Sequence, residues 1–207
     1  MLYKGVKMSG YRIFRPFSIG GFTIIPEGHP VPESSGLQIW LGRKGAFGSG
    51  EHETTASCLM MLERLATIAG STVMDLGSGT GILAIAALKL GAASAVAVDI
   101  EWPAAISCRD NAMLNRVESD CMVICGELGS VGRQQYDVTI ANIYADILMP
   151  LAVQLVEITR PGGLLLLSGI PLQDKYDIWQ RYTNLGCREV DAFIGEEYVT
   201  YLLRKTA

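Results

Sequence analysis

The chain has few of the side chains from which metal and thiol sites are built. It contains only two histidines, His29 and His52, and these lie far apart in the sequence. Its five cysteines are an odd number without Cys-x-x-Cys spacing, so we expect free thiols packed as small apolar side chains. These shortages argue against a zinc site, and we expect no bound metal. The absence of Gly-x-Ser-x-Gly also argues against a serine hydrolase.

Charge and long apolar runs are also scarce. Charged residues make up 18% of the 207, below the roughly 25% of an average soluble chain. The net charge of −4 argues against a protein that holds nucleic acid on a basic surface. The longest apolar runs, residues 82–88 and 164–167, fall short of the roughly 18 residues of a membrane span. The N-terminus has no signal-peptide core, so we expect a cytoplasmic protein without membrane or direct nucleic-acid contacts.

The length predicts one domain with a short extension ahead of it. Residues 1–45 hold four of the eight prolines, which indicates short extended segments and turns and not helix. Within this lead-in we expect residues 11–14 and 21–25 to form a small hairpin. Residues 46–207 are interpreted as the main domain, because strand and helix patterns alternate from there onward.

Hydrophobic spacing in the main domain predicts an α/β fold. Repeated strand–helix–strand units predict a parallel sheet with helices on both faces. The last two strands are separated only by residues 195–197, which predicts an antiparallel hairpin and one antiparallel strand in the sheet. Helices are expected at residues 52–69, 82–90, 103–114, 145–159 and 173–182. Strands are expected at residues 72–76, 95–100, 121–125, 137–142, 164–168, 188–194 and 198–204.

The sharpest local motif is D-L-G-S-G-T-G at residues 75–81, which ends a predicted strand and begins a predicted helix. Glycines at Gly77, Gly79 and Gly81 allow a tight turn and let a ligand approach the backbone closely. Asp99 follows about twenty residues later at the end of the next predicted strand. An acidic side chain there is suited to accept hydrogen bonds from ribose hydroxyls.

Two classes of cofactor use a turn of this kind. A dinucleotide site has G-x-G-x-x-G, so that a pyrophosphate lies on the helix N-terminus. This chain has G-x-G-x-G instead, with Asp75 two residues before the first glycine. A carboxylate there would repel a pyrophosphate and suit a ligand with ammonium and sulfonium groups. The motif therefore favours S-adenosylmethionine over a dinucleotide, with a turn that only reverses the chain as the alternative.

A second motif, A-F-G-S-G-E-H-E-T-T at residues 46–55, precedes the first long helix. Its glycines predict a mobile loop in which Phe47 would cover a bound ligand. Thr54 and Thr55 offer hydroxyl groups near the helix N-terminus. Ordinary capping, with Ser49 or Thr54 as the N-cap, explains the same residues equally well.

A third motif, I-A-N-I-Y-A-D at residues 140–146, lies at the end of a predicted strand. Ligands of doubly wound sheets bind beyond the carboxyl ends of the strands, which would put Asn142 beside the cofactor. Its side-chain carbonyl would accept a hydrogen bond from an amine and orient the nitrogen lone pair. An asparagine that caps the following helix is the alternative.

In this order the three motifs resemble the PrmA family, the bacterial methyltransferases of large-subunit ribosomal protein eleven. The resemblance runs from about residue 19 to the C-terminus and includes P-G-G-L-L-L-L-S-G-I at residues 161–170. It implies a Rossmann-like class I S-adenosylmethionine-dependent methyltransferase. It also implies methylation of lysine side-chain or α-amino nitrogens of a protein, with a ribosomal protein as the candidate partner.

The resemblance also implies roles for individual residues. The family's S-adenosylmethionine-binding positions fall on Thr55, Gly77, Asp99 and Asn142, and its loop aromatic near the donor falls on Phe47. The full set of donor-binding residues we predict is Phe47, Gly48, Thr55, Asp75, Gly77, Gly79, Gly81, Asp99 and Asn142. The predicted catalytic residues are Asn142, Ile143 and Tyr144.

The expected reaction is an in-line displacement in which positioning and dehydration matter most. Asn142 and the backbone carbonyl of Ile143 would hold a neutral amine, and Tyr144 would line the pocket or pack in the core. Full family members carry a further N-terminal domain that recruits the ribosomal protein, and we expect this chain to have only its lead-in. A small-amine methyltransferase, a donor-binding module without catalysis and a dehydrogenase are the alternatives. The sequence predicts no oligomeric state.

Overall fold

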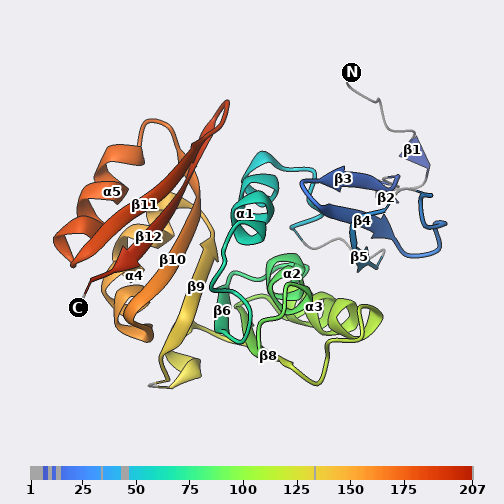
Figure 1. Cartoon of the computed structure of the whole chain (residues 1–207), viewed down its shortest axis with the longest axis horizontal. Coiled ribbons are helices and arrows are strands. Elements are labelled where there is room, and N and C mark those ends of the chain that lie inside the picture. The colour runs from blue at the N-terminus through green and yellow to red at the C-terminus, as the bar shows by residue number, and fades with distance from the viewer. Residues whose placement is uncertain are drawn as a thin grey trace.

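The computed structural model describes residues 7–8, 11–12, 15–33, 35–42, 47–132 and 134–206. A large twisted sheet carries helices on both faces, and a small sheet lies beside it at the N-terminal end of the chain (Figure 1). The predicted α/β architecture, mostly parallel with a C-terminal antiparallel hairpin, is confirmed. None of the helices in the described ranges is long and apolar enough to cross a membrane.

The large sheet has seven strands in the order β11-β12-β10-β9-β6-β7-β8. Neighbours from β10 to β8 are parallel, whereas β12 is antiparallel to both β10 and β11. The strand order reverses between β6 and β9, which is where sheets of this type bind ligands. The strands are β6 (Thr72–Leu76), β7 (Ser94–Asp99), β8 (Cys121–Cys125), β9 (Tyr136–Asn142), β10 (Thr159–Pro171), β11 (Cys187–Ile194) and β12 (Tyr198–Lys205).

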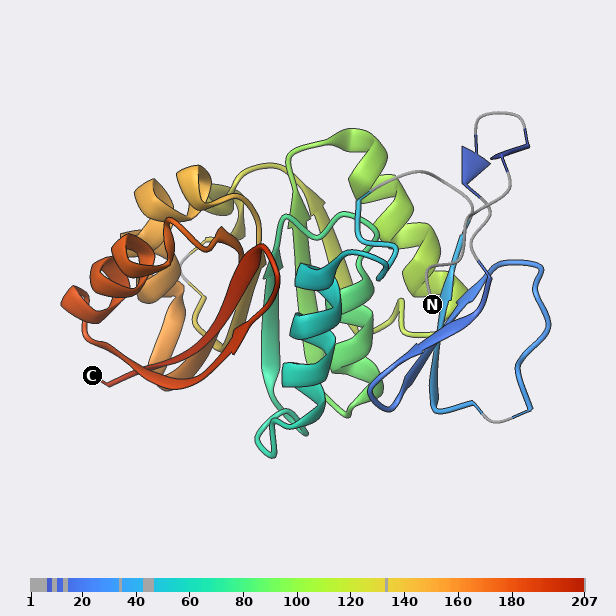
Figure 2. The same cartoon turned by 90° about the horizontal axis from the view of Figure 1, so that it is seen from above.

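Helices cover the two faces in separate groups, with α1, α2 and α3 on one face and α4 and α5 on the other (Figure 2). Because side chains alternate along a strand, every strand of this sheet except the edge strand β11 contributes side chains to both layers. In β6, Val73 packs under the first group, while Met74 and Leu76 pack under the second. The helices are α1 (Glu53–Glu63), α2 (Ile82–Lys89), α3 (Trp102–Leu114), α4 (Ala145–Ile158) and α5 (Lys175–Asn184), with a 3₁₀ turn η1 (Leu128–Val131).

The first helix is shorter than predicted, because α1 ends at Glu63 and not at residue 69. The chain continues in tight turns, in which the Leu65 N–H donates a hydrogen bond to the Leu62 carbonyl and the Ile68 N–H to the Leu65 carbonyl. Leu65 and Ile68 are buried in the core beside the helix. The predicted helix was too long because the turn residues after it bury apolar side chains at a spacing similar to that of a helix.

Strand β10 begins earlier than predicted, at Thr159 and not at residue 164. The Pro161-Gly162-Gly163 segment was expected to precede the strand, but the strand includes it with a shift in register between Thr159 and Leu164. Leu164–Ser168, expected to be a central strand, is buried with strands on both sides.

The N-terminal hairpin has a different partner from the one predicted. Strand β4 (Phe22–Pro26) pairs with β3 (Phe17–Ile19), while β2 (Tyr11–Arg12) pairs with β1 (Lys7–Met8). Gly20 turns the chain between β3 and β4 with a left-handed φ of 54°, which favours glycine. Residues 13–14 of the predicted hairpin lie outside the described ranges. Strand β5 (Leu37–Leu41) adds to β4 in parallel, and this small sheet shares one apolar cluster with α1, α2 and α3.

Candidate donor and acceptor site

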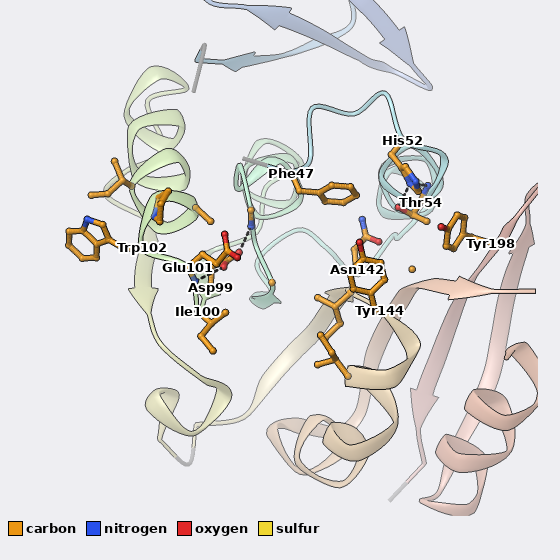
Figure 3. A pocket seen from close by; sticks show the side chains of 18 residues that line it. Phe47, His52, Thr54, Asp99, Ile100, Glu101, Trp102, Asn142, Tyr144 and Tyr198 are labelled. Atoms are coloured by element: carbon orange, nitrogen blue, oxygen red, sulfur yellow. Dashed lines mark hydrogen bonds between the residues drawn. The ribbon is translucent and has the colours of Figure 1, made fainter. Parts of the chain in front are cut away.

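A cavity of about 790 Å³ opens at the carboxyl ends of β6, β7 and β9 (Figure 3). Its walls come from the ends of these strands and the residues that follow them, including the starts of α3 and α4. The segment that leads into α1, one residue of β10 and the start of β12 complete the walls. The position agrees with the expectation that a ligand binds where the strand order reverses.

The cavity brings together most of the predicted site residues. Phe47, Gly77, Gly79, Asp99, Asn142, Ile143 and Tyr144 line it. Four others, Gly48, Thr55, Asp75 and Gly81, lie behind the wall and are not among its lining residues.

The glycine-rich turn packs tightly against its neighbours, and its first two glycines line the cavity. Gly77, Gly79 and Gly81 all have left-handed φ values, of 70°, 53° and 78°. A Cβ on Gly77 would overlap the Ile143 side chain, and one on Gly79 would overlap the Phe47 carbonyl. Gly81 is the N-cap of α2. Only glycine combines this backbone conformation with this close approach.

Asp99 both lines the cavity and ties the glycine turn to the end of β7. One carboxylate oxygen accepts the Gly79 N–H at 2.8 Å, and the other accepts the Glu101 N–H at 3.0 Å. Each oxygen has a further lone pair for a ligand. The carboxylate is therefore fixed in place and directed into the cavity from the side where Ile100, Glu101 and Trp102 gather (Figure 3).

Asp75 does not face the cavity, which corrects the simple electrostatic picture drawn from the sequence. Its side chain is 1% exposed and accepts the Ala84 N–H of α2 at 3.1 Å. Strand alternation turns it toward the α2 side of the sheet. Burial raises the pKa of this carboxyl to about 7; the Ala84 N–H lowers it and the Asp99 charge raises it. The negative charge at the cavity wall belongs to Asp99 and Glu101 instead.

We predict that Asp75 makes the stability of the fold depend on pH. A carboxyl whose folded-state pKa is raised from 3.8 to about 7 stabilises the fold below the unfolded-state pKa. That contribution is lost as the pH rises through the folded-state pKa. The Asp75→Asn variant has no such titration, so its unfolding free energy should gain on the wild type by up to about 1.4 kcal/mol per pH unit between pH 4 and 7. Urea unfolding of both proteins across this range measures the difference, and parallel profiles would contradict the prediction.

The segment before α1 is fastened to the glycine turn through Thr80, a residue that sequence reasoning missed. The Thr80 N–H donates to the Phe47 carbonyl at 2.9 Å, and its hydroxyl donates to the Gly48 carbonyl at 2.6 Å. The Phe47 side chain is 59% exposed and lines the cavity mouth. Thr80 lies inside the predicted motif, but only the fold shows that its hydroxyl bonds to the loop that contains Gly48.

Helix α1 is capped by His52, and neither Ser49 nor Thr54 is its N-cap. The His52 Nδ1 accepts the Thr54 N–H at 3.4 Å and lies 2.8 Å from the Thr54 hydroxyl. Thr55 is buried, and its hydroxyl accepts a hydrogen bond from the Asn142 side-chain amide at 3.4 Å. Capping and site formation, which the sequence left as alternatives, therefore occur together in one segment, because His52 caps the helix and also lines the cavity.

Asn142 ends β9, and its side chain points into the centre of the cavity (Figure 3). It does not cap α4, whose N-cap is Tyr144. With its amide group bonded to Thr55, the side-chain carbonyl of Asn142 is left to accept a bond from a ligand. Tyr144 is 67% exposed at the rim, so it does not pack in the core. Ile143 packs over Gly77 and contributes to the wall.

The lining contains side chains that the sequence did not single out. Ile100, Glu101 and Trp102 directly follow Asp99, so their position at a strand end was a usable signal. Tyr198 comes from β12 and had no local signal. Among the described residues, the lining has two carboxylates, Asp99 and Glu101, and no lysine or arginine.

Comparison with known proteins identifies the family. The model of the ribosomal protein L11 methyltransferase (PrmA) family matches residues 8–206. The ribosomal protein L11 methyltransferase of Pseudomonas paraeruginosa is 43% identical over 171 residues, covering 82% of this chain and 58% of the relative. That of Xylella fastidiosa strain 9a5c is 41% identical over 193 residues, covering 87% and 62%. The chain thus spans about three fifths of the length of these curated relatives.

Solved structures agree with this assignment. The ribosomal protein L11 methylase of Lactobacillus delbrueckii subsp. bulgaricus superposes with a TM-score of 0.83 at 28% identity, covering 94% of this chain and 100% of that one. The magnesium protoporphyrin IX methyltransferase of Synechocystis PCC 6803, solved with S-adenosylmethionine, shares the fold with a TM-score of 0.62 at 18% identity, covering 76% and 80%. The chain belongs to the ribosomal protein L11 methyltransferase (PrmA) family and has the class I methyltransferase fold.

Proposed function

We propose that the chain is an S-adenosylmethionine-dependent N-methyltransferase that acts on lysine or α-amino groups of a protein. The observation that supports this most directly is the cavity itself. It combines a glycine backbone with the Asp99 carboxylate and an asparagine carbonyl at its centre, and its described lining has no lysine or arginine. Family membership supports the same reaction.

The residues present fit the proposed donor. Its ribose hydroxyls suit the Asp99 carboxylate, and its adenine suits the apolar wall at Ile100. The backbone of Gly77 and Gly79 lines the cavity, and neither residue has room for a Cβ, which would meet Ile143 or the Phe47 carbonyl. A pyrophosphate cofactor fits less well, because two carboxylates and no lysine or arginine face it in the described lining.

Once bound, the donor supplies a methyl group on a positively charged sulfur. The protein's part is to present an unprotonated amine to that methyl. A free lysine has a pKa near 10.4, and transfer into a dehydrated pocket lowers it. We propose that the side-chain carbonyl of Asn142 and the backbone carbonyl of Ile143 accept the N–H bonds of the amine and point its lone pair at the methyl. Tyr144, at the rim, would exclude water around the acceptor chain.

The methyl acceptor is proposed to be a ribosomal protein, as the names of the relatives suggest. A nucleic-acid acceptor suits the cavity less, because its phosphates would face Asp99 and Glu101 without a compensating cation in the described lining. We further propose a cytoplasmic location. We also propose residues 46–207 as the methyltransferase domain, with residues 1–45 as a lead-in whose small sheet packs on the helices.

Thermal unfolding tests whether the protein binds S-adenosylmethionine or NAD. We expect S-adenosylmethionine at about 100 times its dissociation constant to stabilise the fold by about 2.7 kcal/mol. For a chain of this size that corresponds to a rise in Tm of about 5–10 °C. NAD at the same concentration should leave the Tm unchanged. A rise with NAD and none with S-adenosylmethionine would overturn the proposal.

Transfer of a radiolabelled methyl group to purified bacterial ribosomal protein L11 and to a total ribosomal-protein extract tests the reaction. Labelled protein is the expected result, and mass spectrometry then identifies the methylated nitrogen. Donor binding without any labelled acceptor would instead favour a module that binds the donor without catalysis.

A further inference from the structure

The carboxylate of Glu53 holds the turn between β11 and β12. It accepts three consecutive backbone N–H groups, from Glu196 at 3.0 Å, Glu197 at 3.0 Å and Tyr198 at 2.8 Å. A Cβ on Gly195 would stand 2.7 Å from the same carboxylate, so the turn closes tightly around it. Hydrogen bonds to an ionised carboxylate are among the stronger ones in proteins. Glu53 therefore joins the first turn of α1 to a hairpin more than 140 residues away in the sequence.

The turn held by Glu53 delivers Tyr198 to the cavity wall. The Tyr198 ring meets the His52 ring edge-on, with centroids 5.3 Å apart, and the His52 ring meets Phe47 at 5.5 Å. All three rings line the cavity. His52 is itself held by its bonds to Thr54. Two adjacent residues therefore hold this wall: His52 contacts the Tyr198 ring, and Glu53 accepts the Tyr198 N–H.

The two ends of the cavity differ in chemistry (Figure 3). Asp99, Glu101 and Trp102 gather at one end, where the proposed donor contacts lie. His52, Thr54 and Tyr198 gather at the other end, and Asn142 lies between the two groups. If the donor occupies the first end with its sulfur near Asn142, the acceptor enters past the second.

We propose that Glu53 is a positioning residue for the acceptor end of the cavity, because it fixes the β11–β12 turn and with it the Tyr198 wall. The inference rests on the proposed function, whose donor and acceptor ends it uses. The turn has further anchors, since Leu172 N–H donates to the Glu197 carbonyl at 3.0 Å and β12 pairs with β10. Loss of the Glu53 carboxylate should therefore shift the turn without unfolding the sheet.

Glu63 provides a matched control at the opposite end of α1. Its carboxylate also accepts a backbone N–H of a turn, from Gly21 at 3.0 Å, and it also faces glycines that leave room for it. That turn joins β3 and β4 and does not line the cavity. A Glu63→Gln variant thus perturbs a carboxylate–turn contact of the same helix without touching the site.

The first test needs no substrate, because the chain has only two histidines. In Glu53→Gln we expect the imidazole NMR signals of His52 to shift as the Tyr198 ring moves, while those of His29 stay in place. The amides of residues 196–198 should exchange about tenfold faster. Glu63→Gln should change neither. Unmoved His52 signals with unchanged exchange would overturn the inference, whatever the enzyme activity.

The second test uses purified bacterial ribosomal protein L11 as the acceptor. Glu53→Gln should raise the KM for the acceptor about tenfold, with the dissociation constant of S-adenosylhomocysteine unchanged by calorimetry. Tyr198→Ala should reproduce the rise in KM, and Glu63→Gln should not. Equal losses of donor and acceptor binding would overturn the positioning role. Absence of methyl transfer by the wild type would refute the proposed acceptor and the acceptor role of the wall, while the NMR and exchange results still decide whether Glu53 holds the turn.

Discussion

Replacing Asn142 with alanine is expected to lower kcat by about a hundredfold or more, while donor affinity changes by only a few-fold. Asn142 stands at the centre of the cavity between the proposed donor end and acceptor end. Its amide group bonds to Thr55, which leaves the carbonyl oxygen for a ligand. This oxygen would orient the acceptor amine during the reaction and would not hold the donor. Loss of the Asn142 side chain should therefore lower turnover more than it lowers donor affinity.

The structure explains why the effect should be specific to chemistry. Asn142 ends β9 beside two parallel neighbours, β6 and β10, so its backbone position does not depend on its side chain. An alanine there leaves a small space at the cavity wall and no unpaired buried charge. We therefore expect the Tm to change little, and we expect the proposed contacts at Asp99 and Gly79 to remain intact.

Single-turnover kinetics with S-adenosylmethionine and ribosomal protein L11, together with calorimetry of the donor, measure the two effects separately. Asn184→Ala is a suitable control, since Asn184 is exposed at the end of α5 and does not line the cavity. Thr55→Val, which removes the hydroxyl that orients the Asn142 amide, should give a smaller loss of kcat in the same direction. If Asn142→Ala turned over at the wild-type rate, Asn142 would have no part in the mechanism.

Local sequence patterns predicted the fold well where periodicity and turn chemistry agree. The strand Thr72–Leu76, the glycine turn and the strand ending at Asp99 lie close to their expected places, because each is bounded by residues with strong conformational preferences. The predicted end of α1 was wrong because Leu65 and Ile68, which lie in turns after the helix, are buried at a helix-like spacing. Apolar spacing reports burial, and burial continues past the helix.

The site was most predictable where its residues lie at or just after strand ends. Asp99 and Asn142 end β7 and β9, so the topology brings them to one edge of the sheet. Side-chain direction was harder to predict, as Asp75 shows, because a single step along β6 decides which of the two helical layers a side chain packs against, and Asp75 lies on the α2 side. Tyr198 could not be predicted as a site residue, because nothing near it in the sequence indicates that its hairpin contacts Glu53.

Replacing Gly79 with alanine should have the largest effect on donor binding, and we expect its dissociation constant to rise about a hundredfold or more. Gly79 has a φ of 53°, and its N–H donates to Asp99 at 2.8 Å. A Cβ on this residue would overlap the carbonyl oxygen of Phe47. That carbonyl accepts the Thr80 N–H, so the clash would separate the glycine turn from the loop that covers the cavity.

Gly70→Ala separates this clash from simple backbone strain. Gly70 has a similar left-handed φ of 75°, but nothing lies within 4 Å of the position its Cβ would take. Both variants should lose about 1–2 kcal/mol of stability from the left-handed conformation. Calorimetry should show weakened donor binding in Gly79→Ala alone, because only there does the added methyl displace Phe47 and, through the Gly79 N–H, the Asp99 carboxylate. Equal donor affinity in the two variants would mean that the bare backbone at Gly79 serves the turn and not the ligand.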